Sequence, residues 1–207
     1  PELIYKGIIY QEKIGLNKIV IPMRCETSKD IGKFSSIVDK INKYVSENKK
    51  TSAEYYLTVS FTDSEIKDAE WVERVLTLLT NVNKVFDGYY IVCDPAPEYK
   101  KKVSVNYDYY NNLSRIFSVL KKNSFKIIYG YANWDAIPFI ALTDIDYVSI
   151  GTFENLRRFN IKRFTEDAGG GPSQGWYYSE KVLNMIRSLE LVKLRSNNCI
   201  DLIRNEK

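Results

Sequence analysis

Short apolar segments alternate along this chain with longer amphipathic ones, and this alternation constrains the fold more than any other feature. The apolar segments begin near residues 55, 88, 125 and 146 and are rich in the β-branched and aromatic residues that favour strands. Strands joined by amphipathic helices form right-handed βαβ units, so the sequence predicts a parallel sheet. The predicted strands are Tyr55–Phe61, Tyr89–Cys93, Phe125–Tyr129 and Tyr147–Ile150.

The segments between the strands have apolar residues at the i, i+3, i+4 and i+7 spacing of helices with one buried face. Ser28 or Asp30 is a suitable N-cap for the first helix, and Thr62 or Asp63 for the second. A short helix is predicted near Ala136–Leu142. The longer helices are predicted to bury Ile31, Phe34, Ile37, Val38, Ile41 and Val45, then Ile66, Ala69, Val72, Val75, Leu76, Leu79 and Val82, then Leu113, Ile116, Phe117 and Leu120.

The two ends of the chain have weaker patterns. Leu3–Tyr10 and Lys18–Met23 predict two strands, which form either a hairpin or a barrel strand preceded by an extended arm. Beyond Ile150 the sequence becomes basic, then acidic, then glycine-rich, which predicts a long loop. A final helix is predicted from about Tyr178, with an interruption at "RSNNC". Its apolar face would contain Val182, Met185, Ile186, Leu189 and Val192.

Two α/β folds fit this order of elements. The first is a TIM-barrel-like fold, and the second is an open, flavodoxin-like doubly wound sheet. An eight-stranded barrel usually needs about 250 residues, whereas this chain has 207 residues and five or six predicted strands. We therefore predict one barrel-like domain over residues 1–207, either an incomplete barrel or the C-terminal portion of a larger one.

One segment resembles a known group of proteins. Lys126–Phe159, with "YGYANW" and "DIDYVSIGTFENLRRF", followed by "GWYYS", resembles the C-terminal part of (β/α)8-barrel proteins of uncharacterised function. Those proteins have a "G-x-x-N" strand end, a "V-D-x-x-x-x-G-T" strand and then an Arg-rich loop. The resemblance implies a barrel fold and a position for Asn133 and Gly151 at the carboxyl ends of the strands. It implies no activity.

The chain contains no histidine, which excludes Ser-His and Cys-His catalytic pairs and the commonest transition-metal ligand. Its three cysteines are widely spaced without a CxxC motif, so we expect neither a disulfide framework nor a cysteine metal site, and we expect a reduced, cytoplasmic setting. No apolar stretch has the length of a membrane helix. The net charge of +4 permits anionic partners without requiring nucleic acid. No cofactor is predicted.

Polar residues directly follow two of the predicted strands. Asp94 ends "YYIVC", and Asn133, Trp134 and Asp135 follow the next strand. Because the carboxyl ends of parallel strands line active sites, Asp94 and Asp135 are candidate catalytic carboxylates, and Asn133 and Trp134 are candidate ligand contacts. The alternative is local capping, with Asp94 in a turn before Pro95 and with Asn133 or Asp135 at a helix start.

A second candidate site follows the last predicted strand. Gly151 and Thr152 precede "FENLRRF", and the N–H groups of a helix start bind anions. Arg157 and Arg158 would complete this site with bidentate hydrogen bonds. The alternative is an ordinary glycine turn with solvated arginines. The later stretch "EDAGGGPSQGW" fits either a mobile lid or a flexible connector.

These features leave two functional hypotheses. The first is an enzyme that binds an anionic, phosphate- or nucleotide-like small molecule, and carboxylate-only chemistry favours glycosyl transfer or hydrolysis. The second is a non-catalytic module in which "LRRFNIKRF" contacts a protein or nucleic acid. An incomplete barrel also has exposed sheet edges, which predicts self-association.

Overall fold

The computed structural model describes residues 2–24, 30–81, 85–95, 106–152, 157–161 and 175–205. Its contacts divide the chain into two compact units, Pro1–Thr165 and Glu166–Lys207, and each is described separately below. The prediction of a single domain over residues 1–207 stays a prediction. None of the helices in the described ranges has the length and apolar character needed to cross a membrane.

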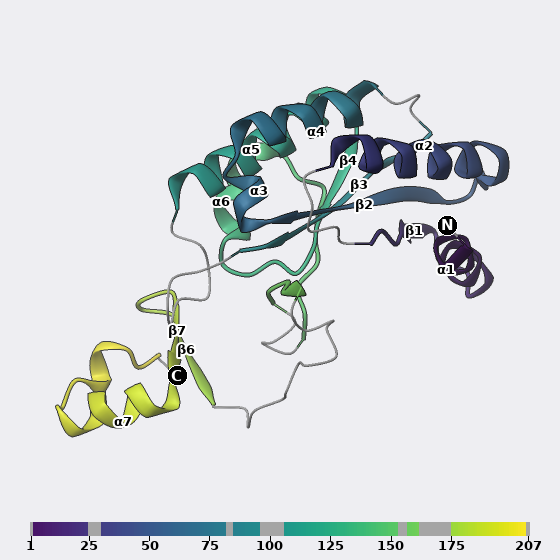
Figure 1. Cartoon of the computed structure of the whole chain (residues 1–207). Coiled ribbons are helices and arrows are strands. Elements are labelled where there is room, and N and C mark those ends of the chain that lie inside the picture. The colour runs from purple at the N-terminus through teal and green to yellow at the C-terminus, as the bar shows by residue number, and fades with distance from the viewer. Residues whose placement is uncertain are drawn as a thin grey trace. The chain divides into compact units, whose positions relative to one another are not determined.

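The first unit contains a parallel sheet of five strands that curls into a half-barrel (Figure 1). Every neighbouring pair is parallel, and the strand order follows the chain order, β1-β2-β3-β4-β5. The predicted common direction of the strands is therefore confirmed, and a complete eight-stranded barrel is not shown. The strands are β1 (Lys18–Ile21), β2 (Glu54–Thr62), β3 (Gly88–Asp94), β4 (Lys126–Tyr129) and β5 (Tyr147–Val148).

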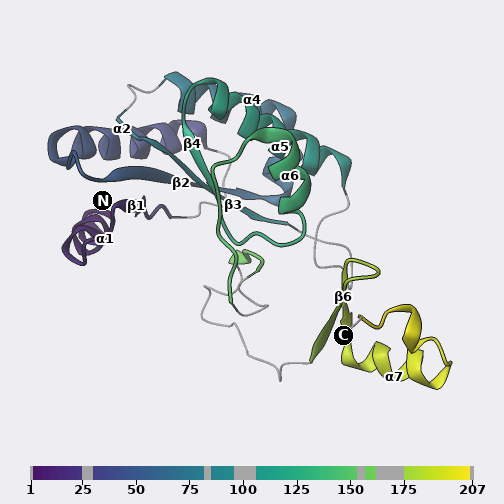
Figure 2. The same cartoon turned by 180° about the vertical axis from the view of Figure 1, so that it is seen from behind.

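The helices that connect the strands lie over one face of the sheet, as the opposite views of Figures 1 and 2 show. They are α2 (Ile31–Asn48), α3 (Asp63–Ile66), α4 (Ala69–Asn81), α5 (Tyr107–Lys122) and α6 (Ala136–Thr143). Alternate strand residues form the core beneath them, because successive side chains on a strand point to opposite faces. In β2 these core residues are Tyr55, Leu57, Val59 and Phe61, all at most 2% exposed.

Most of the predicted helix starts and buried faces are confirmed. The Asp30 side chain accepts the Lys33 N–H at 3.0 Å and caps α2, while the alternative cap Ser28 lies outside the described residues. Thr62 caps α3 in a capping box with Glu65. The second predicted helix is divided, because α3 ends at Ile66 and the Asp68 side chain accepts the Trp71 N–H at the start of α4. Ala69 is exposed, and Val82 lies outside the described residues.

The prediction of a strand at Leu3–Tyr10 is wrong, because this segment lies within helix α1 (Glu2–Lys13). Ile8 is 1% exposed and packs into the core, and α1 contacts β1. The Gln11 carboxamide accepts the Val20 N–H at 2.9 Å and donates to the Val20 carbonyl at 2.8 Å. One side chain thus occupies the hydrogen-bonding positions that a neighbouring strand would use at the free edge of β1.

The predicted final helix from Tyr178 is also partly wrong. The described part of the second unit contains an antiparallel hairpin, β6 (Trp176–Ser179) and β7 (Asn184–Arg187), and the helix α7 (Ser188–Ser196) follows it. Leu183 has φ = 46° in the connecting turn. A short 3-10 helix, Ile200–Leu202, follows α7. Val182, Leu189 and Val192, predicted as one buried face, are 50–63% exposed.

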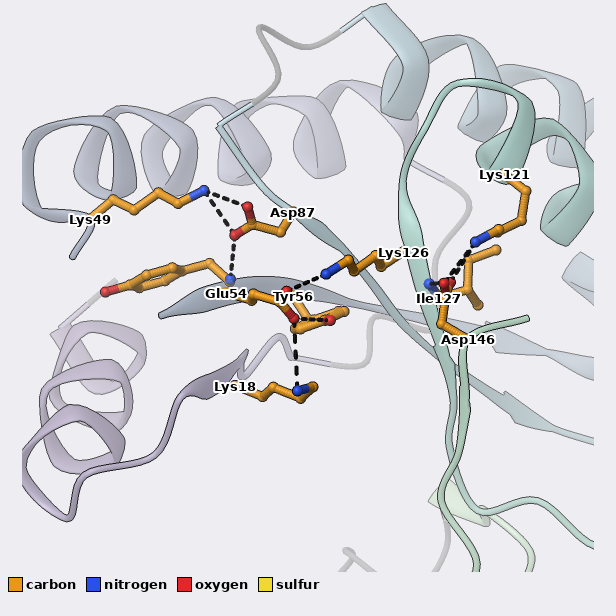
Figure 3. Close-up of polar contacts among 10 residues, drawn as sticks. Lys18, Lys49, Glu54, Tyr56, Asp87, Lys121, Lys126, Ile127 and Asp146 are labelled. Carbon is orange, nitrogen blue, oxygen red and sulfur yellow. Dashed lines mark hydrogen bonds and ion pairs between the residues drawn. The ribbon is translucent and has the colours of Figure 1, made fainter. Parts of the chain in front are cut away.

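Two aspartates at the amino end of the sheet bind both a strand and a lysine (Figure 3). Asp87, just before β3, accepts the Tyr55 N–H of β2 at 2.7 Å and pairs with Lys49 at 2.8 Å. Asp146, just before β5, accepts the Ile127 N–H of β4 at 2.7 Å and pairs with Lys121 at 2.8 Å. The same arrangement therefore occurs twice. In each case an aspartate just before one strand pairs with a lysine at a helix end, and it also accepts the N–H of the second residue of the preceding strand.

Candidate functional site

At the carboxyl ends of β3 and β4 the strand ends and the segment 157–161 enclose a small hollow of about 220 Å³, open to solvent. Four of the predicted site residues line it, and they come from two separate loops. Asn133 and Asp135 follow β4, while Arg157 and Arg158 belong to the returning segment. The other lining residues are Cys93, Pro95, Tyr129, Tyr131 and Phe159.

The loop after β4 is held by backbone hydrogen bonds to both neighbouring strands. The Gly130 N–H donates to the Ile91 carbonyl at 2.8 Å, and the Ala132 N–H donates to the Ser149 carbonyl at 3.0 Å. Tyr131 lies between them with φ = 55°. A non-glycine residue in this left-handed region needs support from its surroundings. The loop therefore has one defined path, which places Asn133 at the hollow.

Asp135 is a buried carboxylate, 8% exposed, that fixes this loop. It accepts the Tyr129 hydroxyl at 2.6 Å and the Asn133 N–H at 2.9 Å. Burial raises the pKa of the Asp135 carboxyl, and these hydrogen bonds act in the opposite direction. Both described contacts hold the loop, and Asp135 occupies the N-cap position of α6 without a capping hydrogen bond made by its side chain.

Asp94 ends β3 and anchors the returning segment rather than lining the hollow. Its carboxylate accepts the Ile161 N–H at 3.0 Å. Two arginine contacts fix the same segment: Arg158 Nη2 donates to the Pro95 carbonyl at 3.0 Å, and Arg157 Nε donates to the Gly151 carbonyl at 3.1 Å. The segment is thus tied to the carboxyl ends of the strands at three points.

Three further predicted residues are not among those lining the hollow. The Trp134 carbonyl accepts the Ile137 N–H at the start of α6, and Gly151 contributes its carbonyl to Arg157. Thr152 lies in a bend. Residues 153–156, on which the predicted anion-binding helix start depends, lie outside the described residues, as do 162–174 with most of the glycine-rich loop.

Two tyrosines of this site were not predicted from the sequence. Tyr129 is the last residue of β4, and its ring packs against Phe117 and Phe139 while its hydroxyl binds Asp135. Burial raises the pKa of Tyr129 well above its ordinary value. Tyr131 packs edge-to-face on Phe159, with ring centroids 5.3 Å apart. The alternation of β4 indicates the direction of Tyr129, but nothing local indicates the contact with residue 159.

Cys93 is buried and forms no disulfide among the described residues. Burial raises the pKa of the Cys93 thiol, so it stays protonated at neutral pH and is a poor nucleophile. Within the described ranges, no three acidic or cysteine side chains gather into a group that could hold a metal ion.

Two side chains at the hollow have hydrogen-bonding groups that no other described residue uses. The only described hydrogen bond of Arg157 is made by its Nε. Asn133 bonds through its backbone, and its carboxamide has no partner among the described residues. The Nη groups of Arg157 and the Asn133 amide are therefore donors available to a ligand.

Searches against protein-family models, curated proteins and solved structures found no match to this chain.

Proposed function

We propose that this protein binds a small anionic ligand at the carboxyl ends of β3 and β4. The observation that supports the proposal is the meeting of Asn133 and Arg157, from two separate loops, at one hollow with unused donors. Ligands of parallel α/β folds bind outside the carboxyl ends of the strands. The sequence-based resemblance to barrel proteins implies the same position for Asn133.

The size and charge of the hollow favour one anionic group. The hollow is small and open to solvent, so it does not enclose a drug-sized ligand. The guanidinium of Arg157 has planar donors that match phosphate or carboxylate oxygens in a bidentate geometry. The buried Asp135 lies at the same hollow, and the hydrogen bonds from Tyr129 and Asn133 compensate its charge in part. We infer a ligand whose phosphate or carboxylate group enters the hollow while the rest stays outside.

The reaction, if the protein is an enzyme, stays a prediction. The described contacts of Asp94 and Asp135 position loops, and both carboxylates are held by backbone or tyrosine donors. We therefore propose them as positioning residues of the anion site. The alternative interaction module needs Phe159 at the surface, and this residue is 9% exposed and packs on Tyr131.

The finer fold that we propose is an incomplete TIM-type barrel. In the described sheet the strands follow one another in chain order, whereas a flavodoxin-like sheet has the order 2-1-3-4-5. Helices on one face with a curled sheet are the arrangement of successive βα units in a barrel wall (Figure 2).

A thermal-shift titration with inorganic phosphate tests the anion site. A ligand that binds only the folded state stabilises it by RT ln(1 + [L]/Kd), so the melting temperature rises with the ligand concentration. We expect stabilisation by phosphate beyond that of sodium chloride at the same ionic strength, and loss of this difference in Arg157→Gln and Asn133→Ala. The matched control is Arg115→Gln, which removes an arginine whose described partner is Glu73 at the surface. Equal phosphate effects in Arg157→Gln and the control would refute the site.

A further inference from the structure

A larger hollow lies beyond the carboxyl end of β1, where β2 continues without β1 beside it. The β1–β2 pairing ends at Ile21 and Leu57, while β2 extends to Thr62. The hollow beyond this step contains about 560 Å³ and is open to solvent. Its lining includes Met23, Arg24, Asp30, Phe34, Glu65 and Trp71.

Glu65 is the deepest charged group of this hollow, and only 4% of it is exposed. Its Oε2 accepts the Thr62 N–H at 2.7 Å and the Thr62 hydroxyl at 2.9 Å. Its other oxygen, Oε1, accepts no hydrogen bond from the part of the chain that the structure describes. The described residues therefore leave Oε1 able to accept an N–H group or to pair with a cation that a ligand brings.

The charges around the opening balance. Arg24 and Lys33 are basic, Asp30 is acidic, and all three are exposed, whereas the acidic Glu65 is buried. The wall between them is mostly apolar and includes Phe34 and Trp71. Two acids and two bases around an apolar wall do not suit a ligand with a large net charge. They suit a ligand that carries one charge of each sign on an apolar body.

We propose that this hollow binds a small zwitterion with an apolar body, of the class of free α-amino acids with aromatic or branched side chains. The ligand's ammonium group donates to Glu65 Oε1, and its carboxylate faces Arg24 at the opening. Its apolar side chain packs on Phe34 and Trp71. The proposal goes beyond the anion site and does not depend on it, because the two hollows share no lining residue.

Calorimetric titration of the full chain with L-phenylalanine tests the proposal. Phenethylamine and 3-phenylpropionate serve as probes that each lack one of the two charged groups. We expect L-phenylalanine to bind about tenfold or more tightly than either, since a hydrogen bond to a charged group contributes about 1.5–3 kcal/mol. No saturable binding of L-phenylalanine at millimolar concentration, or equal binding of the three probes, overturns the proposal.

Glu65→Gln is the decisive variant. Glutamine also suits the third position of a capping box, so the Thr62 contact and the fold are retained. We expect about tenfold or greater weakening of L-phenylalanine binding in Glu65→Gln. The control is Glu73→Gln on α4, which neutralises a half-exposed glutamate outside the hollow. Unchanged binding in Glu65→Gln overturns the proposal.

Arg157→Gln separates this proposal from the anion site. It should abolish the phosphate effect and leave L-phenylalanine binding unchanged, while Glu65→Gln should do the reverse. Loss of L-phenylalanine binding in Arg157→Gln contradicts the assignment of two independent sites.

Discussion

The amino and carboxyl ends of the five strands of the half-barrel differ in how their polar side chains are paired. At the amino end each described aspartate is matched by a lysine and by a strand amide, as Asp87, Lys49 and Tyr55 illustrate (Figure 3). At the carboxyl end Arg157 and Asn133 retain donors that no described residue uses. The described polar groups of the amino end are therefore paired with one another. Under the proposed function, stability and binding lie at opposite ends of the same strands, as in α/β barrels generally.

The largest expected difference in unfolding free energy between the two ends comes from substituting one glycine at each end. A Cβ at Gly88, where β3 begins, would fall on the backbone carbonyl of Lys126, which cannot move aside. A Cβ at Gly130, after β4, would meet only the ring of Tyr90, a side chain that can rotate. We expect Gly88→Ala to lose about 3 kcal/mol of unfolding free energy and Gly130→Ala about 1 kcal/mol, measured by urea denaturation. Equal losses would mean that the amino end is no more rigid than the carboxyl end.

Asp87→Ala should have the next largest effect. It leaves the Tyr55 N–H without its acceptor and Lys49 without its carboxylate, so we expect a loss of about 2–3 kcal/mol. Asp39→Ala, at an exposed position of α2, is the control and should change stability by less than about 0.5 kcal/mol. Urea unfolding of both variants measures the difference. A loss in Asp87→Ala no larger than in the control would show that this contact does not stabilise the sheet.

Lowering the pH should change the stability contributed by Glu54 and by Asp135, one at each end, in opposite directions. Hydrogen bonds from Lys126 and Tyr56 lower the pKa of Glu54 at the amino end, so the stability that Glu54 contributes is lost as the pH falls through its folded pKa. Burial raises the pKa of Asp135 at the carboxyl end, so its ionisation destabilises the folded state as the pH rises through that pKa.

The corresponding measurement compares unfolding free energies between pH 3 and pH 7, the range around and above the ordinary carboxyl pKa of about 4. As the pH falls, the stability advantage of the wild type over Glu54→Gln should shrink. The wild type should gain relative to Asp135→Asn over the same range. Parallel trends in the two variants would contradict the assigned environments.

The smallest stability effect is expected for Arg157→Gln. We expect less than about 0.5 kcal/mol, together with loss of the phosphate response. Lys121→Gln at the amino end removes two contacts to Asp146 and should lose about 1 kcal/mol with the phosphate response intact. Thermal unfolding with and without phosphate gives both values. Loss of the phosphate response in Lys121→Gln would show that stability and phosphate binding are not separated between the two ends of the strands.

The sequence allowed the sheet to be predicted where local periodicity and tertiary structure agree. From Tyr55 to Val148 each apolar run is a strand and each amphipathic run a helix, so their order determined the shared direction. Leu3–Tyr10 has the same apolar, β-branched character as a strand, yet it is helical because Ile8 packs into the core and Gln11 binds Val20. Those partners lie elsewhere in the chain and leave no local signal.

The site was predictable to the same extent. The parallel order of the strands allowed Asn133 and the arginines to be predicted at one end of the sheet. Whether a polar side chain lines the hollow or holds a loop depends on side-chain direction, and this separates Asn133, which lines the hollow, from Asp94, which holds Ile161. The pairing of Tyr131 with Phe159 joins residues 28 positions apart and depends on the path of the returning segment.

The hydrogen bonds between Gln11 and Val20 make the two edges of the sheet different. The Gln11 carboxamide offers Val20 one N–H and one carbonyl oxygen, as a peptide unit of a neighbouring strand would, and its second N–H donates to the Gly7 carbonyl at 3.1 Å. Within the described chain the outer side of β5 has no paired strand, so this side of the sheet has an open edge. Gln11→Ala should reopen the blocked side and allow extension in both directions.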